Sequence, residues 1–318
     1  MPRQISLSQQ VTQDSAGLRL DQAAVELFPD FSRGRLQTWI KLGELTVNGK
    51  RVKPSARMLG GEKLCIEAQL VSEGEVQPQD IPLDIIFTDE HLLILNKPAG
   101  LVVHPAAGNW DGTLQNALLH YAPDLDTLPR SGIVHRLDKD TSGVMVVARS
   151  LKAHASLVNQ LQTRSMSRVY EAVVKGDIPP AGTIKANIDR NPRDRKKMAV
   201  RESGRTATSH YKLIQRLPGT SHVEVSLESG RTHQIRVHMT HIGYPIVGDL
   251  LYGRGPIKQK GLPESAITAI NQFPRQALHA RTLRLIHPET GEECEFSAPL
   301  ADDINELIVT LRQSMSDG

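Results

Sequence analysis

Two stretches near the N-terminus, residues 18–28 and 33–42, carry apolar residues at helical spacing, which predicts two short helices. Pro29 ends the first helix, and Gly43 suits the left-handed position that follows the second. The apolar faces are formed by Leu20, Ala24 and Leu27 in the first helix and by Leu36, Trp39 and Ile40 in the second.

A strand, a tight turn and a second strand are predicted over residues 45–52. Residues 45–47 and 50–52 are the two strands, and Asn48 and Gly49 tolerate the positive φ angles that a two-residue hairpin turn requires. A further apolar stretch, residues 63–68, closes this small N-terminal module.

From residue 83 onward the pattern becomes rich in strands. Thr113 and Ser150 are suitable N-caps for two intervening helices, and Asp302 and Asp303 open a terminal helix. The order indicates an α+β domain on a mixed, largely antiparallel β-sheet with flanking helices. Besides the strands described below, strands are predicted at residues 84–87, 92–95, 101–103, 208–214 and 222–227.

Between the two parts, residues 71–82 are polar, acidic and interrupted by Pro78 and Pro82. Such a composition is typical of a linker. We therefore expect an N-terminal domain over residues 18–70, a linker over residues 71–82 and a larger domain over residues 83–318.

The composition is that of an ordinary globular chain, with 39% apolar and 23% charged residues. Cys65 and Cys294 are isolated in the sequence, which argues against a disulfide framework and against a thiolate metal site. The first ten residues lack the apolar core of a signal peptide, and no apolar run is long enough to span a membrane. We expect a cytoplasmic protein.

Charge is unevenly distributed along the chain. Residues 31–57 hold seven basic residues against Glu44 alone, which gives a local net charge of +6. Residues 62–90 hold eight acidic residues against Lys63 alone. This segregation predicts a basic face on the N-terminal domain.

The stretch from Ser131 to Ala148 places charged residues between two apolar runs. Residues 132–134 and 144–148 are predicted as short buried strands, and residues 135–140 as the loop between them. In that loop Asp138 has basic neighbours on both sides, Arg136 and Lys139, which favour its ionised form. An aspartate in such a loop could equally serve only to stabilise a turn.

Four ordered motifs decide between these interpretations. The loop sequence His135-Arg-Leu-Asp-Lys-Asp-Thr-Ser-Gly143 resembles the signature of the RluA/RluD family of RNA pseudouridine synthases. The other three motifs of that family also have similar sequences in this chain, in the same order, at residues 95–105, 167–174 and 227–238. The resemblance therefore covers nearly the whole chain.

The resemblance implies a set of site residues. Asp138 matches the catalytic aspartate, Tyr170 the tyrosine that stacks on the uracil, and Arg231 the basic residue that pairs with the aspartate. Arg136 matches the position whose side chain enters the RNA as the target base leaves the helix. The reaction needs no metal and no cofactor, and the sequence has neither a Walker loop nor a Gly-x-Gly-x-x-Gly motif for a nucleotide.

The predicted N-terminal module resembles the S-four-type RNA-binding domain of a ribosomal protein. Its candidate RNA-binding residues are Arg33, Arg35, Lys50 and Arg51, although a basic helix face is more often simply solvated. A second basic segment, residues 189–205, has a net charge of +4 and is predicted as a loop. This loop is either a solvated insertion or a clamp on the phosphate backbone.

Within the family, residues 109–121 most resemble the branch that modifies large-subunit (23S) ribosomal RNA. This implies several uridines of the helix 69 stem-loop as targets, in naked RNA or in the ribosomal particle. Three alternatives are a sibling synthase with another ribosomal target, a non-catalytic RNA-binding assembly factor, and a metal-dependent hydrolase that uses His135, His233 and His238. The histidines lack a carboxylate or thiolate partner at metal-site spacing, which disfavours the hydrolase.

Overall fold

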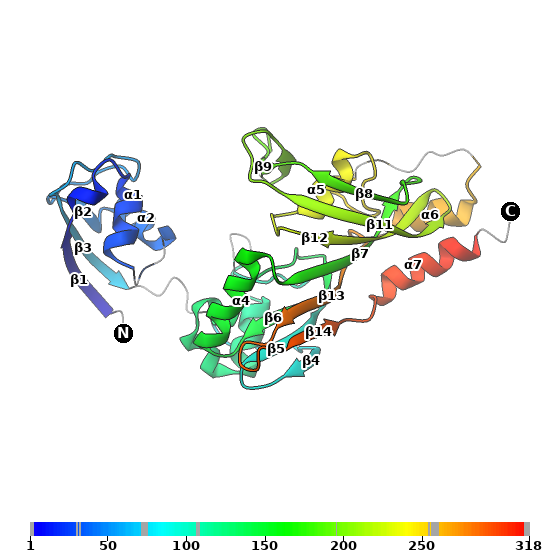
Figure 1. Cartoon of the computed structure of the whole chain (residues 1–318), viewed down its shortest axis with the longest axis horizontal. Helices are drawn as coiled ribbons and strands as arrows, with labels where there is room; N and C mark the ends of the chain where they lie inside the picture. Colours follow the sequence, from blue (N-terminus) through cyan, green and yellow to red (C-terminus); the bar gives the residue numbers. More distant parts are fainter. Residues whose placement is uncertain are drawn as a thin grey trace. The chain divides into compact units, whose positions relative to one another are not determined.

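The computed structural model describes residues 3–29, 31, 33–70, 76–105, 109–194, 196–253, 255 and 261–314. The chain divides into two compact units, Met1–Glu75 and Val76–Gly318 (Figure 1). Each unit has its own hydrophobic core, so each is described by itself.

The N-terminal unit packs two helices, α1 (Leu20–Leu27) and α2 (Arg33–Leu42), on an antiparallel sheet. The sheet has the order β1-β3-β2, and a 3-10 turn, η1 (Gln13–Ser15), follows its first strand. Its strands are β1 (Arg3–Gln10), β2 (Leu45–Val47) and β3 (Lys63–Leu70). The fully buried side chains at the centre of the core include those of Leu20, Leu36, Ile40, Leu45, Leu64 and Ile66.

The sequence pattern is correct for both helices and for the turn of this unit. Asn48 and Gly49 have φ angles of 49° and 74°, and the amides of Val47 and Lys50 each donate to the other's carbonyl oxygen over 2.9 Å. The predicted strand over residues 50–52 is wrong, because only Lys50 forms an isolated bridge. Residues 45–47 pair instead with β3, whereas β1 was not predicted.

The larger unit is built on a nine-stranded mixed sheet of order β4-β5-β6-β13-β7-β12-β11-β8, with β14 paired to β13 (Figure 1). Only β6 and β13 pair in parallel within this sheet, which confirms the predicted fold class. Its strands are β4 (Ile85–Thr88), β5 (Leu92–Lys97), β6 (Ser142–Ala148), β7 (Ser167–Lys175), β8 (Ala181–Lys185), β11 (Thr208–Leu217), β12 (Thr220–Leu227), β13 (Leu278–Ile286) and β14 (Glu293–Ser297).

Glycine makes the parallel pairing of β6 and β13 possible at its closest point. Gly143 lies opposite Ala280 with φ of 116°, and a Cβ atom there would collide with the Ala280 backbone. Only glycine accommodates both the backbone angle and the close approach.

Three helices of the larger unit, α3, α4 and α7, begin where the sequence predicted their starts. Thr113 and Ser150 accept hydrogen bonds from the third residue of α3 and α4, and the apolar face of α7 is buried. The helices are α3 (Leu114–Tyr121), α4 (Leu151–Thr163), α5 (Gln234–His241), α6 (Glu264–Gln272) and α7 (Asp302–Gln313), with 3-10 turns η2 (Pro123–Thr127) and η3 (Pro129–Gly132).

Two predicted strands and part of the predicted linker differ from the structure. Residues 101–103 and 132–134 form only isolated bridges, through Val102 and Ile133. Residues 71–75 of the linker lie outside the described residues, whereas residues 76–82 are attached to the larger unit. Asn116 donates to the Gln77 carbonyl oxygen over 2.8 Å and accepts from the Gln79 amide over 3.0 Å at its own carbonyl oxygen.

None of the helices in the described part of the chain combines the length and apolar character that crossing a membrane requires.

Candidate active site

The loop of residues 135–140 precedes β6 and is held from several sides. Leu137 is buried in the core beneath it, and the Lys139 carbonyl oxygen accepts from the Gly100 amide over 2.9 Å. Arg275 donates to the Asp140 carbonyl oxygen over 2.9 Å and is itself held by a bidentate ion pair with Asp303. The loop is therefore fixed through its backbone, which leaves the Asp138 side chain free for other contacts.

Lys97, at the end of β5, is the most deeply buried charged side chain near this loop, with 0% of its surface exposed. Its Nζ donates to the carbonyl oxygens of Pro98, Leu101 and Lys139 over 2.6, 2.9 and 3.0 Å. Burial lowers the pKa of Lys97 to about 7, opposed by the nearby charge of Asp140. Lys97 thus joins the motif of residues 95–105 to the Asp138 loop.

His135 stabilises the start of the loop as a neutral ring. Its Nε2 accepts a hydrogen bond from the Val146 amide over 3.1 Å. Burial lowers the pKa of His135 to about 3, with a further contribution from the charge of Arg168. The imidazole is therefore an acceptor at neutral pH and ties the loop to β6.

Asp138 is paired with Arg236, not with Arg231 as the sequence predicted. Nη1 of Arg236 donates to Oδ2 of Asp138 over 2.9 Å, while its Nε and Nη2 donate to the two carboxylate oxygens of Asp249 over 2.7 and 2.9 Å. Arg236 is 7% exposed and Asp249 2% exposed, so this ion-pair network is largely shielded from water. Burial opposes the ionisation of Asp249, but the hydrogen bonds from Arg236 lower its pKa on balance.

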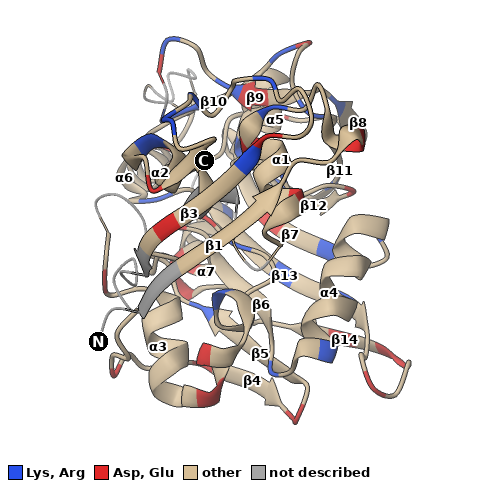
Figure 2. Ribbon diagram, turned by 90° about the vertical axis from the view of Figure 1, so that its left-hand side faces the viewer, with Lys and Arg blue, Asp and Glu red and all other residues tan. Residues whose placement is uncertain are grey.

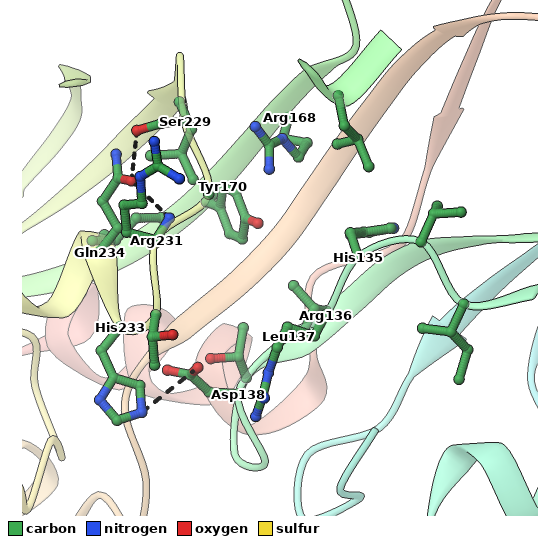
Figure 3. Close-up of a pocket in the computed structure, with 18 of the residues that line it drawn as sticks. His135, Arg136, Leu137, Asp138, Arg168, Tyr170, Ser229, Arg231, His233 and Gln234 are labelled. Carbon is green, nitrogen blue, oxygen red and sulfur yellow. Dashed lines mark hydrogen bonds and ion pairs between the residues drawn. The ribbon is translucent and has the colours of Figure 1, made fainter. Parts of the chain in front are cut away.

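Arg231 lies in the turn before α5, where its side chain points to a different partner. Its Nε donates to the Thr206 carbonyl oxygen over 3.3 Å, and its amide donates to Oε1 of Gln234 over 3.0 Å. Gln234 also accepts from the hydroxyl of Ser229 over 2.8 Å (Figure 3). The buried Gln234 side chain thus fixes the turn that carries Arg231.

His233 approaches Asp138 from the other side. Its Nε2 lies 3.8 Å from Oδ1 of Asp138, and its Nδ1 lies 2.8 Å from the hydroxyl of Tyr252. The Tyr252 hydroxyl accepts from the Met198 amide and keeps its own proton, which it can donate to His233 Nδ1 when the ring proton is on Nε2. Burial lowers the pKa of His233, so the neutral form is favoured.

Tyr170 lies on β7 and faces the same cavity as Asp138 (Figure 3). It is 7% exposed, and among the described residues none hydrogen-bonds to its hydroxyl. Burial raises the pKa of Tyr170, so the phenol stays protonated at neutral pH. The ring therefore offers the cavity an aromatic face and a hydroxyl without a protein partner among these residues.

The cavity that these residues line has a volume of about 960 Å³. Its wall is formed by the Asp138 loop, β7, the end of α4 and the turn before α5. It carries two acidic residues, Asp138 and Glu228, against six arginines. The arginines are Arg130, Arg136, Arg164, Arg168, Arg231 and Arg236. A cavity of this size and charge suits a nucleotide with its phosphates.

Each unit of the chain matches a known protein family. Residues 91–241 match the model of the RNA pseudouridylate synthase family, and residues 18–64 match the S4 domain. The chain is 51% identical over 313 residues to ribosomal large subunit pseudouridine synthase D of Pseudomonas aeruginosa, covering 98% of each chain. It is 48% identical over 318 residues to the protein of that name from Escherichia coli K12, covering 100% of this chain and 98% of that one.

The chain belongs to the RNA pseudouridylate synthase family. It is accordingly an RNA pseudouridine synthase with an N-terminal S4 domain. Among solved structures it resembles human RNA pseudouridylate synthase domain containing 4, with a TM-score of 0.58 at 25% identity over 72% of this chain and 93% of that one. Human RNA pseudouridylate synthase domain containing 1 gives a TM-score of 0.54 at 25% identity, over 76% and 98%.

The predicted RNA-binding residues of this pseudouridine synthase occupy different settings. Arg136 is exposed and lines the cavity beside Asp138. Lys50 and Arg51 are exposed at the turn after β2, where the Arg51 side chain packs over Gly43. Arg33 and Arg35 begin α2, but their side chains lie outside the described residues.

The basic segment of residues 189–205 is not a simple loop. It forms most of an antiparallel hairpin of β9 (Ile188–Arg190) and β10 (Met198–Val200). Figure 2 shows Lys and Arg in blue on the ribbon around this hairpin. The bond from the Met198 amide to Tyr252 connects the hairpin to His233 and hence to the Asp138 site.

The histidines considered as metal ligands do not meet. In the part of the chain that the structure describes, no three His, Cys, Asp or Glu side chains group as a metal site would. His238 instead contacts the Ser209 hydroxyl and the Ala186 carbonyl oxygen, each over 2.9 Å. These contacts give His238 a role in packing α5 on β11.

Sequence reasoning missed three residues of this synthase site: Lys97, Arg236 and Asp249. Arg236 lies inside the quoted motif of residues 227–238, so the motif located the right segment but not the right arginine. The sequence could have indicated Lys97, because this lysine ends the apolar run that begins at Leu92. A charged residue in such a buried strand needs hydrogen-bond partners. Asp249 follows a glycine in a turn and carries no such signal.

Proposed function

We propose that this synthase isomerises uridine to pseudouridine in large-subunit ribosomal RNA, at several uridines of the helix 69 stem-loop. The observation that carries the proposal is the side chain of Asp138, which faces a basic cavity, is paired with Arg236 and lies in the same cavity as Tyr170. The large-subunit target is supported by the name of the relatives that are 46–51% identical to the chain.

Pseudouridylation replaces one bond within a nucleotide by another. The bond between N1 of uracil and C1′ of ribose breaks, a bond between C5 and C1′ forms, and the proton on C5 is lost while N1 gains one. Positive charge develops at the ribose as the first bond breaks, so a carboxylate is needed there to attack or to stabilise it. We assign this role to Asp138.

Arg236 takes the pairing role that the sequence gave to Arg231. Two of its nitrogens are held by Asp249, so its third is aimed at Asp138 with little freedom. A guanidinium fixed in this way keeps the carboxylate ionised and oriented. Tyr170 supplies the face on which the uracil stacks.

A uridine inside a stem-loop must leave its helix before it can reach Asp138. Arg136 is exposed at the cavity and is two residues from Asp138, so we propose that its side chain occupies the place of the extruded base. Its planar guanidinium can stack on the neighbouring bases and pair with phosphate.

The rest of the RNA is proposed to bind the basic surfaces of both units. In the S4 domain the basic surface consists of Arg33, Arg35, Lys50 and Arg51. Residues 71–75 then connect this domain to the synthase domain. In that domain the segment of residues 189–205, which forms most of the β9–β10 hairpin, acts as a clamp on the phosphate backbone, because its net charge is +4 and it is bonded to the site through Tyr252. With ribosomal RNA as its substrate, naked or in the ribosomal particle, we propose that the enzyme acts in the cytoplasm.

The test is release of tritium from helix 69 RNA labelled at C5 of uracil, measured with a metal chelator present. A synthase releases tritium and leaves pseudouridine at the mapped positions. An RNA-binding assembly factor releases no tritium. A metal-dependent hydrolase loses its activity when the chelator is present. A sibling synthase releases tritium only from another segment of ribosomal RNA. Mapping pseudouridines in ribosomal RNA from a deletion strain identifies the sites.

A further inference from the structure

Arg168 is a buried arginine of the cavity for which the proposed function has no role. It lies on β7 two residues before Tyr170, and both side chains alternate to the same face of the strand, so their Cα atoms are about 7 Å apart. Arg168 is only 9% exposed, yet it lines the cavity with Tyr170 and Asp138 (Figure 3).

The guanidinium of Arg168 has no counter-charge in the described part of the chain. Its Nε is buried without a hydrogen-bond partner, and no ion pair or hydrogen bond joins its other nitrogens to a described residue. Glu228 also lines the cavity, but it is engaged by Arg164 over 3.3 Å and by His210 over 2.8 Å. The other buried arginine of the cavity, Arg236, is paired twice.

Such an arrangement does not serve folding. Burying the Nε of a charged guanidinium without a hydrogen-bond partner costs free energy, and an apolar side chain of similar length on β7 would carry no such cost. The chain nevertheless makes room for the guanidinium at Gly230, where a Cβ atom would collide with Nη1 of Arg168. The position is therefore built for a ligand that completes it.

We propose that Arg168 binds a backbone phosphate of the RNA next to the target uridine. The inference rests on the proposed function, because it requires the target nucleotide to enter this cavity with its base against Tyr170. A neutral carbonyl of the base would leave the positive charge of Arg168 uncompensated, whereas a phosphate neutralises it and matches the fork of the guanidinium with two oxygens. Because Arg168 and Tyr170 are about 7 Å apart along β7, a phosphate bound by Arg168 would lie within one nucleotide of the uracil that stacks on Tyr170.

The experiment uses helix 69 stem-loop RNAs in which one phosphate at a time, on either side of the target uridine, is replaced by a neutral methylphosphonate. Binding and single-turnover pseudouridine formation are measured for wild type and for Arg168→Gln. For unmodified RNA we expect Arg168→Gln to weaken binding about 10- to 100-fold, as for the loss of a charge-assisted hydrogen bond. The log-log slope of affinity against salt should fall by about 0.7–0.9.

The decisive result is the combination of the two changes. At one linkage, the methylphosphonate should weaken binding to the wild-type protein about as much as Arg168→Gln weakens binding to unmodified RNA. The same methylphosphonate should weaken binding to Arg168→Gln only slightly further, because both changes remove the same interaction. Arg164→Gln is the matched control: its arginine lines the same cavity but is already paired with Glu228, so this variant should keep its sensitivity to that methylphosphonate.

Thermal denaturation separates this role from a structural one. Removal of an unpaired buried charge should leave the melting temperature of Arg168→Gln unchanged or raised, whereas a structural arginine would lower it on substitution. If Arg168→Gln does not fold, Arg168→Lys keeps the charge and is compared with wild type on the same RNAs. The proposal is overturned if, at every linkage, the methylphosphonate weakens binding to Arg168→Gln by the same factor as binding to wild type. RNA that binds in this pattern but forms no pseudouridine would overturn the proposed function alone.

Discussion

Arg236 donates a 2.9 Å hydrogen bond to Asp138, which lies 98 residues earlier in the chain. The bond joins the first turn of α5 to the loop before β6, and Asp249 holds the other edge of the same guanidinium. The orientation of the proposed nucleophile thus depends on a network of three charged side chains from three separate segments.

This network predicts that Arg236 matters more for turnover than Arg231. Arg236→Met should lower kcat by about 100-fold or more, since a fixed electrostatic partner is lost, and Arg236→Lys should retain part of the rate because it keeps the charge without the fork. Arg231→Met should change mainly KM. Steady-state kinetics on helix 69 RNA decide the matter, and equal losses of kcat in both methionine variants would contradict the assignment.

The control for Arg236→Met addresses folding. The substitution leaves Asp249 buried without its partner, which by itself should destabilise the protein. The double variant Arg236→Met/Asp249→Asn removes that unpaired charge, so it should recover stability in a thermal melt while staying as slow as Arg236→Met.

Asp138→Asn should keep the fold and the affinity for RNA but abolish pseudouridine formation, because it preserves shape and removes the attacking charge. Asp140→Asn should be mild, since the backbone carbonyl of that residue, and not its side chain, is bonded to Arg275. Tritium release measures both. Appreciable isomerisation by Asp138→Asn would remove this residue from the mechanism.

Lys97→Met should destabilise the protein by about 2–5 kcal/mol, because three carbonyl oxygens lose their shared donor in the interior. Lys139→Met is the matched control: it changes an exposed lysine of the same loop but keeps the carbonyl oxygen that Lys97 binds, and should cost less than about 0.5 kcal/mol. Denaturant unfolding compares the two. Similar stabilities of both variants would mean that Lys97 does not hold the loop.

The lowered pKa of His135 predicts that the protein loses stability in acid. Its pKa is about 3 in the folded protein, whereas the unfolded chain should titrate near 6.5, so between these values the unfolded state binds one more proton. The contribution is fully present above pH 6.5 and is lost as the pH falls toward 3. His135→Gln should show a shallower decline in unfolding free energy from pH 7 to 4, while His241→Gln, at an exposed histidine, should match wild type.

Removal of residues 1–75 should leave a folded synthase domain, since the larger unit has its own core. RNA binding should weaken and become less dependent on salt, by about 0.7–0.9 in the log-log slope for each phosphate that the protein no longer binds. Lys50→Gln/Arg51→Gln in the full chain should account for up to two of those phosphates. An unchanged slope after the truncation would mean that the S4 domain does not bind RNA phosphates.

The sequence by itself determined the elements whose signals are local. The two N-terminal helices, the caps at Thr113 and Ser150, and the turn at Asn48 depend on neighbouring residues and formed where the pattern placed them. The ordered motifs likewise identified the family, and they are the reason why Asp138 is proposed as the nucleophile.

Tertiary structure alone decided which distant groups meet. Arg231 and Arg236 lie five positions apart in one motif, and only the start of α5 at Gln234 determines that the second of them faces Asp138. In the same way β1 is a weakly apolar edge strand that is defined by its pairing with β3, and the three acceptors of Lys97 come from two loops. Such contacts depend on the packing of the whole sheet, which no local pattern specifies.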